Sequence, residues 1–255
     1  SAPSEAAAVD RVGPRSVRLS VTDRCDYACT YCRPSRRDGH ADGRLTLDGW
    51  ATLVDGLIAA GVRRFRLTGG EPLLVPHVGD LVRLIAARGV SDLALTTSAS
   101  QLARLAAPLR DAGLMRINVS IDSLDPERFA RLTRGGRLAD VLAGIEAARA
   151  AGLGPIKLNA VVLRGENDGE LAELVEYAWA RGLVPRLLEV MPIGVGRALA
   201  ETSLVTVREM RERLGPLLAD GPLSVEPERG PARYVAARHD ATLRVGFISG
   251  TSDTY

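Results

Sequence analysis

The three cysteines of this 255-residue chain, Cys25, Cys29 and Cys32, stand within one short segment with C-x3-C-x2-C spacing. Thiols this close together do not pair sensibly as disulfides, and an odd number leaves one over. Their natural use is to bind a metal ion or an iron–sulfur cluster. A structural zinc ion prefers four protein ligands, whereas three cysteines on a four-iron cluster leave one iron open to a small molecule. The spacing therefore favours an iron–sulfur cluster.

Two other uses of these cysteines stay open. His40 could complete a zinc site as the fourth ligand. Alternatively, Cys29 and Cys32 could form a redox pair, with Cys25 incidental. The three histidines of the chain form no spaced cluster, and nothing resembles the Ser-His-Asp set of hydrolases.

Strand-like and helical patterns alternate along most of the chain. The expected strands are 17–22, 63–68, 92–97, 116–122, 156–162 and 186–190. The expected helices are 47–60, 77–87, 99–112, 138–151 and 169–181. Strands that alternate with helices at this spacing form βαβ units with right-handed crossovers and a parallel sheet. The six units are fewer than the eight of a closed barrel.

Polar side chains share one face of these strands. In the second strand, for example, Arg64, Arg66 and Thr68 alternate with Phe65 and Leu67. The apolar face must pack under the helices, so the polar face must line the interior. A closed barrel fills its interior with branched apolar side chains, and a doubly wound sheet has strands that are apolar throughout. We therefore predict an α/β fold: a laterally open, partial (β/α)6 TIM-type barrel that holds a charged ligand.

The chain divides into three predicted regions: a flexible arm at 1–14, the barrel at 15–200 and a small antiparallel extension at 201–255. The extension contains a helix at 205–214 and strands at 232–238 and 242–248. A net charge of +2 and the lack of any long apolar run argue against a nucleic-acid or membrane partner. We expect a cytoplasmic protein, because the cysteines fit a reducing compartment and no signal peptide is seen.

The cysteine run resembles the signature of the radical S-adenosylmethionine (SAM) superfamily, in which an aromatic residue, here Tyr31, precedes the last cysteine. Three segments narrow the resemblance to the MoaA-like GTP 3′,8-cyclases of molybdenum cofactor biosynthesis. They are residues 18–25 (RLSVTDRC), 67–74 (LTGGEPLL) and 116–125 (RINVSIDSLD). The motifs recur in the family's order, and the resemblance covers about residues 15–250.

The resemblance implies a [4Fe-4S] cluster on Cys25, Cys29 and Cys32. The positions implied to bind SAM are Tyr31, Gly69, Gly70, Glu71, Ser120 and Met191. Those implied to bind GTP are Arg18, Arg66, Thr96 and Lys157. Blander roles exist for several of them: Tyr31 as a packing aromatic, Ser120 as a strand serine and Met191 as a core methionine. Lys157 could form an ion pair with Glu189, and the direction of Thr96 is uncertain from simple alternation.

The implied activity is that of a radical SAM lyase. The reduced cluster cleaves SAM to a 5′-deoxyadenosyl radical, which takes the hydrogen from C3′ of GTP, and the sugar radical attacks C8 to form 3′,8-cyclo-7,8-dihydro-GTP. Such an enzyme needs an electron donor such as flavodoxin or ferredoxin, and a homodimer is possible. The two alternatives are a related enzyme acting on another nucleotide, a peptide or a natural product, and a non-catalytic metal or iron–sulfur protein.

The sequence departs from the family pattern in three respects. Ser98 and Ala99 stand where the family has Asn-Gly, and Val75 stands where it has arginine. The family also continues beyond its Gly-Phe-Ile-Ser segment into a second three-cysteine cluster, whereas this sequence ends at Tyr255. A second [4Fe-4S] cluster is therefore expected only if further residues follow.

Overall fold

A computed structural model describes residues 16–37, 45–225 and 230–250. The predicted arm at 1–14 and His40, the possible zinc ligand, lie outside these residues. Among the helices of the described part, none is long and apolar enough to cross a membrane.

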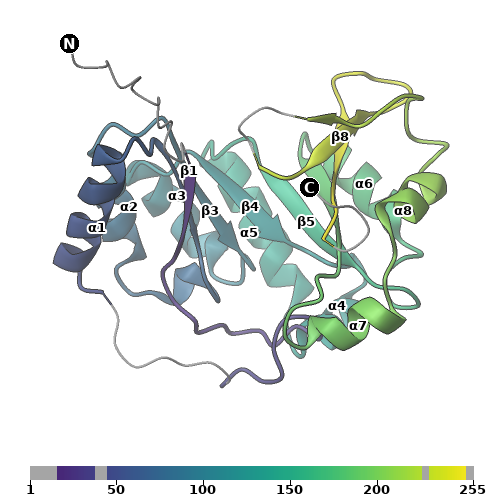
Figure 1. Cartoon of the computed structure of the whole chain (residues 1–255), viewed down its shortest axis with the longest axis horizontal. Coiled ribbons are helices and arrows are strands. Elements are labelled where there is room, and N and C mark those ends of the chain that lie inside the picture. The colour runs from purple at the N-terminus through teal and green to yellow at the C-terminus, as the bar shows by residue number, and fades with distance from the viewer. Residues whose placement is uncertain (1–15, 38–44, 226–229, 251–255) are drawn as a thin grey trace, which may run out of the picture.

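The described strands form one nine-stranded sheet in the order β1-β2-β3-β4-β5-β6-β9-β8-β7 (Figure 1). The strands are β1 (Ser16–Ser20), β2 (Arg64–Thr68), β3 (Asp92–Thr97), β4 (Arg116–Ser120), β5 (Lys157–Val162), β6 (Val184–Glu189), β7 (Ser224–Val225), β8 (Arg233–Ala236) and β9 (Arg244–Ile248). Strands β1 to β6 pair in parallel with their sequence neighbours. The predicted open, partial barrel is confirmed.

The C-terminal extension differs in one detail from the expectation. Strand β9 pairs in parallel with β6, so it continues the barrel sheet as a seventh parallel strand. Only β8 and β7 are antiparallel to their neighbours. Pairing partners of this kind are set by the tertiary fold, and the alternation of a short strand does not reveal them.

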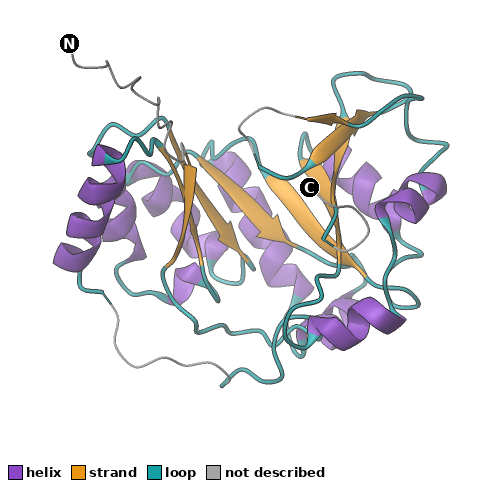
Figure 2. Ribbon diagram, in the orientation of Figure 1, coloured by secondary structure: helices purple, strands orange, loops and turns teal. Residues whose placement is uncertain are grey.

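The helices cover the outer face of the sheet, and α3 and α5 lie behind it in Figure 2. They are α1 (Leu47–Ala59), α2 (Val78–Ala86), α3 (Leu102–Asp111), α4 (Pro126–Thr133), α5 (Leu138–Ala150), α6 (Leu171–Trp179), α7 (Gly196–Thr202) and α8 (Val207–Arg213), with a short 3-10 turn at Pro72–Leu74. Helices α4 and α7 were not predicted. They have eight and seven residues, which gives little helical period to detect; α8, of seven residues, lies within the predicted helix at 205–214.

Strand register explains why the barrel interior is polar. Leu67, Leu95 and Ile117 form one row across β2, β3 and β4, and all three are fully buried under the helices. Burial of each such side chain contributes about 1.5–3 kcal/mol. Neighbouring positions point the other way, into the barrel, because side chains alternate along a strand. The row of Thr96, Asn118 and Lys157 faces the interior.

Candidate active site

The three cysteines lie on the loop that follows β1, at the carboxyl end of the barrel strands. All three are free thiols; Cys25 and Cys29 are half-buried and Cys32 is exposed. Burial raises the pKa of Cys25 to about 11 and raises the pKa of Cys29, to which the charges of Asp122, Cys32 and Cys25 add. Both thiols are therefore neutral at pH 7 until a metal stabilises their thiolates, and metal binding must release their protons.

The cysteine loop is fastened to the end of α4. The backbone N–H of Ala28 donates to the carbonyl of Thr133 at 3.2 Å, and that of Thr30 donates to Leu132 at 2.9 Å. Within the described residues no three His, Cys, Asp or Glu side chains converge on a point that would hold a single ion. The thiolates of a [4Fe-4S] cluster bind different irons and need no such point. Three free thiols on one tethered loop fit that cluster.

The glycine turn after β2 packs directly against the cysteine loop. Gly70 N–H donates to the carbonyl of Thr22 at 2.6 Å, and Glu71 N–H donates to that of Arg24 at 2.7 Å. A Cβ at Gly69 would lie 2.2 Å from the Thr22 carbonyl oxygen, and one at Gly70 would lie 2.1 Å from that of Arg24. Only glycine fits this close approach. The structure thus brings the turn and the cysteines together.

The side chain of Glu71 is occupied by the neighbouring chain. Its Oε1 accepts from Thr97 Oγ1 at 2.6 Å and from Leu73 N–H at 2.9 Å, and its Oε2 accepts from Ser98 N–H at 2.6 Å. Burial raises the pKa of Glu71, and these hydrogen bonds oppose the rise. The Glu71 carbonyl accepts from Leu74 N–H at 3.1 Å and has one further lone pair for a ligand.

The Tyr31 side chain joins the cysteine loop to the end of β4. Its hydroxyl donates to Asp122 Oδ2 at 2.7 Å, and its ring packs against a small buried cluster that includes Leu132, Leu163 and Val190. The side chain is thus a packing aromatic with a polar anchor. Its backbone carbonyl lies close to the start of α7, where a Cβ at Gly196 would be 3.1 Å from it.

Ser120 and Met191 lie at the same end of the barrel. Ser120 is the last residue of β4 and faces the interior beside Asn159. Met191 follows β6 and is 42% exposed, so it is not a core methionine. A Cβ at Gly250 would lie 2.9 Å from Met191 Cγ, which places the end of the described chain against this side chain.

Cations line the barrel interior below this end. Arg18 and Arg66 are in register with one another, and Arg66 Nε is buried without a hydrogen-bond partner. Burial lowers the pKa of Arg66 to about 10, with the charges of Arg18, Arg186 and Arg116 as further causes. A cavity of about 110 Å³ opens near the amino ends of the strands, lined by Arg18, Arg66 and Arg116 together with Asp92, the ion-pair partner of Arg116. The buried Nε of Arg66 without an acceptor favours an anionic ligand at this surface.

Lys157 and Thr96 belong to the same interior surface. Asn118 Nδ2 donates to Thr96 Oγ1 at 3.1 Å, which settles the direction of Thr96. Lys157 is 1% exposed, donates to Tyr234 Oη at 3.0 Å and lines a second cavity of about 350 Å³.

The alternative pairing of Lys157 with Glu189 is wrong. Glu189 is paired with Val162, which lies five residues beyond Lys157 on β5. The Cα atoms of Lys157 and Glu189 are therefore about 16 Å apart.

Two interior residues were missed by sequence reasoning. Arg186 donates to Asn159 Oδ1 at 2.8 Å and to Asn118 Oδ1 at 2.9 Å; it sits on the polar face of a predicted strand, where alternation could have found it. Tyr234 reaches the interior from β8 in the extension. No sequence signal marks Tyr234, because its contact with Lys157 joins positions 77 residues apart.

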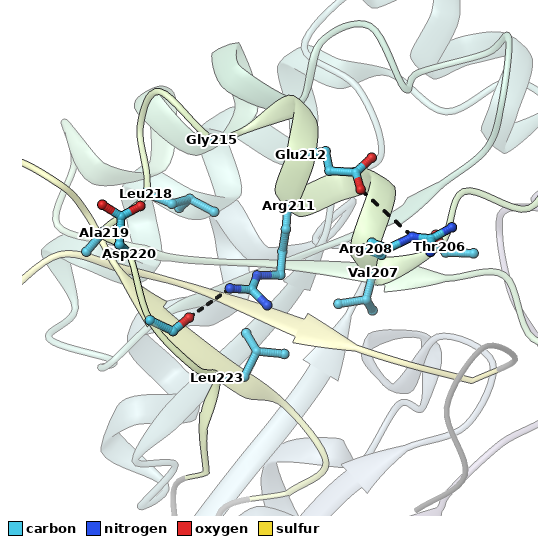
Figure 3. Close-up of a pocket in the computed structure, with 11 residues that line it drawn as sticks. Thr206, Val207, Arg208, Arg211, Glu212, Gly215, Leu218, Ala219, Asp220 and Leu223 are labelled. Carbon is cyan, nitrogen blue, oxygen red and sulfur yellow. Dashed lines mark hydrogen bonds and ion pairs between the residues drawn. The ribbon is translucent and has the colours of Figure 1, made fainter.

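A further hollow, of about 660 Å³, lies on the outside of the extension along α8 (Figure 3). The two arginines that line it, Arg208 and Arg211, are bonded to other residues of the same region. Arg211 donates to the carbonyl of Gly221 at 2.9 Å, and Arg208 pairs with Glu212 at 3.8 Å. It shares no lining residue with the barrel interior, and the candidate site stays inside the barrel.

Comparisons with known proteins identify the family. The Radical SAM superfamily model matches residues 19–178. The chain is 47% identical to GTP 3′,8-cyclase 1 of Pseudomonas aeruginosa, over 94% of this chain and 73% of that protein. It is 43% identical to the GTP 3′,8-cyclase of Marinobacter nauticus, over 94% and 72%.

Among solved structures, Streptococcus suis SuiB bound to S-adenosylmethionine has a similar fold, with a TM-score of 0.65 at 14% identity. The match covers 94% of this chain and 51% of SuiB. From the family model and the curated relatives, the chain belongs to the radical SAM superfamily and, within it, to the GTP 3′,8-cyclase family.

Proposed function

We propose that this protein is a radical SAM lyase that cyclises GTP to 3′,8-cyclo-7,8-dihydro-GTP in molybdenum cofactor biosynthesis. Membership of the superfamily implies a [4Fe-4S] cluster and SAM. When bound, these groups supply a 5′-deoxyadenosyl radical that removes a hydrogen atom from the substrate. The protein's own task is to hold the cluster and SAM at one end of the barrel and the nucleotide below them, away from water.

The cysteine end of the barrel supports the first half of the proposal. Cys25, Cys29 and Cys32 would hold the cluster, since their loop is tied to α4 and to the glycine turn. The backbone of Gly69, Gly70 and Glu71 would contact SAM, because the Glu71 carboxylate is already engaged. Tyr31, Ser120 and Met191 would complete the SAM site around this end.

The observation that carries the substrate assignment is the set of cations that line the interior. Arg66 has a buried Nε without an acceptor, and after burial the charges of Arg18 and Arg186 further lower its pKa. A triphosphate supplies several negative charges at short range and would neutralise this cluster. We therefore assign Arg18, Arg66 and Lys157 to the phosphates of GTP. Thr96 would add a hydroxyl.

The departures from the family pattern lie outside this cationic surface. Val75 is buried in the main core. The Ser98 N–H donates to the Glu71 carboxylate. Ala99 is buried against Gly144 of α5 and has a left-handed backbone conformation, with φ 65°. Because these three residues support the scaffold, their departure from the family pattern does not argue against GTP as the substrate.

Three features of the proposal go beyond the relatives' names and stay predictions. Cleavage of SAM consumes one electron, so a donor of the flavodoxin or ferredoxin class is required. A second [4Fe-4S] cluster is expected only with residues beyond Tyr255. A homodimer is possible, and its test is the molecular mass in solution.

The test uses GTP that carries deuterium at C3′ with the anaerobically reconstituted, reduced protein and SAM. We expect 5′-deoxyadenosine to form when GTP is present and to contain one deuterium. Guanosine, which has the same base and sugar without the phosphates, should support far less cleavage because it cannot engage Arg18 and Arg66. SAM cleavage that ignores GTP, with no deuterium in the product, would reject GTP as the substrate.

A further inference from the structure

Asp122 lies just beyond the carboxyl end of β4, where three parts of the chain meet. Its carboxylate is 2% exposed. Oδ2 accepts the hydrogen bond of the Tyr31 hydroxyl at 2.7 Å, and Oδ1 accepts that of Val161 N–H at 2.9 Å. The cysteine loop, β4 and β5 are therefore joined through a single buried side chain.

Asn167 braces the same junction from the loop after β5. Its Nδ2 donates to the carbonyl of Asp122 at 2.7 Å and to that of Val161 at 2.8 Å, while its Oδ1 accepts from Leu163 N–H at 2.8 Å. Asn167 is fully buried. Asp122 is thus fixed on its backbone side as well as through its carboxylate. A network in which each member is satisfied is rigid.

The position of Tyr31 in the chain gives this junction its importance. Tyr31 stands between Cys29 and Cys32, and Cys32 N–H donates to the carbonyl of Cys29 at 2.9 Å. Whatever fixes the ring of Tyr31 also fixes the backbone that joins two of the three cysteines. The ring is held by apolar packing at its sides and by Asp122 at its tip.

We propose that Asp122 is a positioning residue for SAM. Through the Tyr31 hydroxyl it holds the segment from Cys29 to Cys32 in the orientation in which the backbone of Tyr31 meets the cofactor. This inference rests on the proposed function, since it takes SAM to be the ligand at this end of the barrel. Asp122 touches neither SAM nor the cluster itself and acts through Tyr31.

The chemistry of substitution follows from the two hydrogen bonds. Tyr31→Phe removes the donor and leaves a buried carboxylate oxygen unpaired. Asp122→Asn keeps an acceptor oxygen for Val161 N–H but replaces the charged acceptor of the Tyr31 hydroxyl by an amide N–H₂, which can only donate to the Tyr31 oxygen in a weaker, neutral bond. Either change loosens the loop. Because both act on one contact, the double variant should bind SAM no more weakly than the weaker single variant.

The test compares Tyr31→Phe, Asp122→Asn and the double variant after anaerobic reconstitution. Leu174→Ala is the control; it opens a cavity in the separate core cluster around Phe247. The readouts are iron content, the dissociation constants of SAM and GTP by equilibrium dialysis, urea unfolding, and the EPR spectrum of the reduced cluster with and without SAM.

We expect wild-type iron content and an unchanged dissociation constant for GTP in both single variants. Their dissociation constant for SAM should rise at least about tenfold, as loss of a hydrogen bond to a charged group predicts. The EPR change on adding SAM should differ from wild type. Leu174→Ala should lose stability and keep wild-type SAM affinity and spectrum.

The proposal is overturned if both single variants bind SAM within about twofold of wild type with an unchanged spectrum, or if Leu174→Ala weakens SAM equally. Failure of the proposed substrate looks different. In that case the wild type binds SAM, the variants weaken it as expected, and GTP does not stimulate cleavage, so the role of Asp122 stands.

Discussion

The buried carboxylates at the carboxyl end of the barrel differ in their bonding from two guanidinium groups in its interior. At the carboxyl end, the buried carboxylates of Glu71 and Asp122 have donors on both oxygens. In the interior, Arg66 has a buried Nε without an acceptor, and the guanidinium of Arg186 rests on the neutral amides of Asn118 and Asn159. The difference separates buried charges that stabilise the fold from buried charges that bind a ligand.

A satisfied charge holds the chain in place. Glu71 locks the glycine turn to the end of β3, and Asp122 locks the cysteine loop to β4 and β5. An unbalanced charge instead costs free energy until a ligand of opposite sign arrives. Under the proposed function, the carboxyl end is a preformed frame for the cluster and SAM, whereas the interior is a site that its ligand completes.

The largest expected effect comes from removing a cluster ligand. Cys29→Ala should lose most of its bound iron and all detectable SAM cleavage, because no neighbouring cysteine remains to replace it. Its circular dichroism spectrum should match wild type, since the loop is also held by backbone bonds to α4. The check is iron analysis with chromatography of 5′-deoxyadenosine. Full iron content and activity would show that Cys29 is not a cluster ligand.

A large loss of stability is expected when a methyl group is placed between the glycine turn and the cysteine loop. Gly70→Ala should lower the free energy of unfolding by at least about 3 kcal/mol, because its Cβ would lie 2.1 Å from the Arg24 carbonyl oxygen. Urea unfolding measures the change.

The matched control is Gly56→Ala on the outside of α1, where a Cβ meets nothing within 4 Å. It should raise the free energy of unfolding by about 1 kcal/mol, because alanine is the better helix former. Equal effects of the two changes would refute the close packing of turn and loop.

A third change weakens the frame without touching the interior. Glu71→Gln should lower the free energy of unfolding by about 2 kcal/mol, because the new amide N–H₂ faces the donors that now bind the carboxylate. Binding of GTP should not change, as measured by equilibrium dialysis. Asp80→Asn, which breaks an exposed pair with Arg83, is the control and should cost less than about 0.5 kcal/mol. Weaker GTP binding in Glu71→Gln would contradict the division between frame and interior.

The sequence predicts the fold well because the period-2 alternation of the strands reports both faces of the sheet. Phe65 and Leu67 mark the helix side, and Arg66 marks the interior. The sequence also places the cysteines and the glycine turn on adjacent loops, since strand order fixes which loops are neighbours.

What the sequence did not predict depends on contacts between distant segments. Tyr234 meets Lys157 only because β8 folds back beside β9, and the parallel pairing of β9 is likewise a property of the whole sheet. Glu71 lies in a motif that the resemblance links to SAM, yet its carboxylate accepts a hydrogen bond from Thr97 at the end of β3. Only the structure shows this contact.

The most direct test of the central claim is the Arg66→Met variant, measured for both stability and GTP affinity at low salt. We predict opposite signs: the free energy of unfolding rises by about 1 kcal/mol, because a largely buried cation whose charged neighbours are mostly cations is removed. The dissociation constant for GTP rises at least about tenfold. The exposed Arg83→Met control should change neither quantity appreciably. A variant that is less stable than wild type and binds GTP equally well would contradict the claim that the interior cations bind the phosphates of GTP.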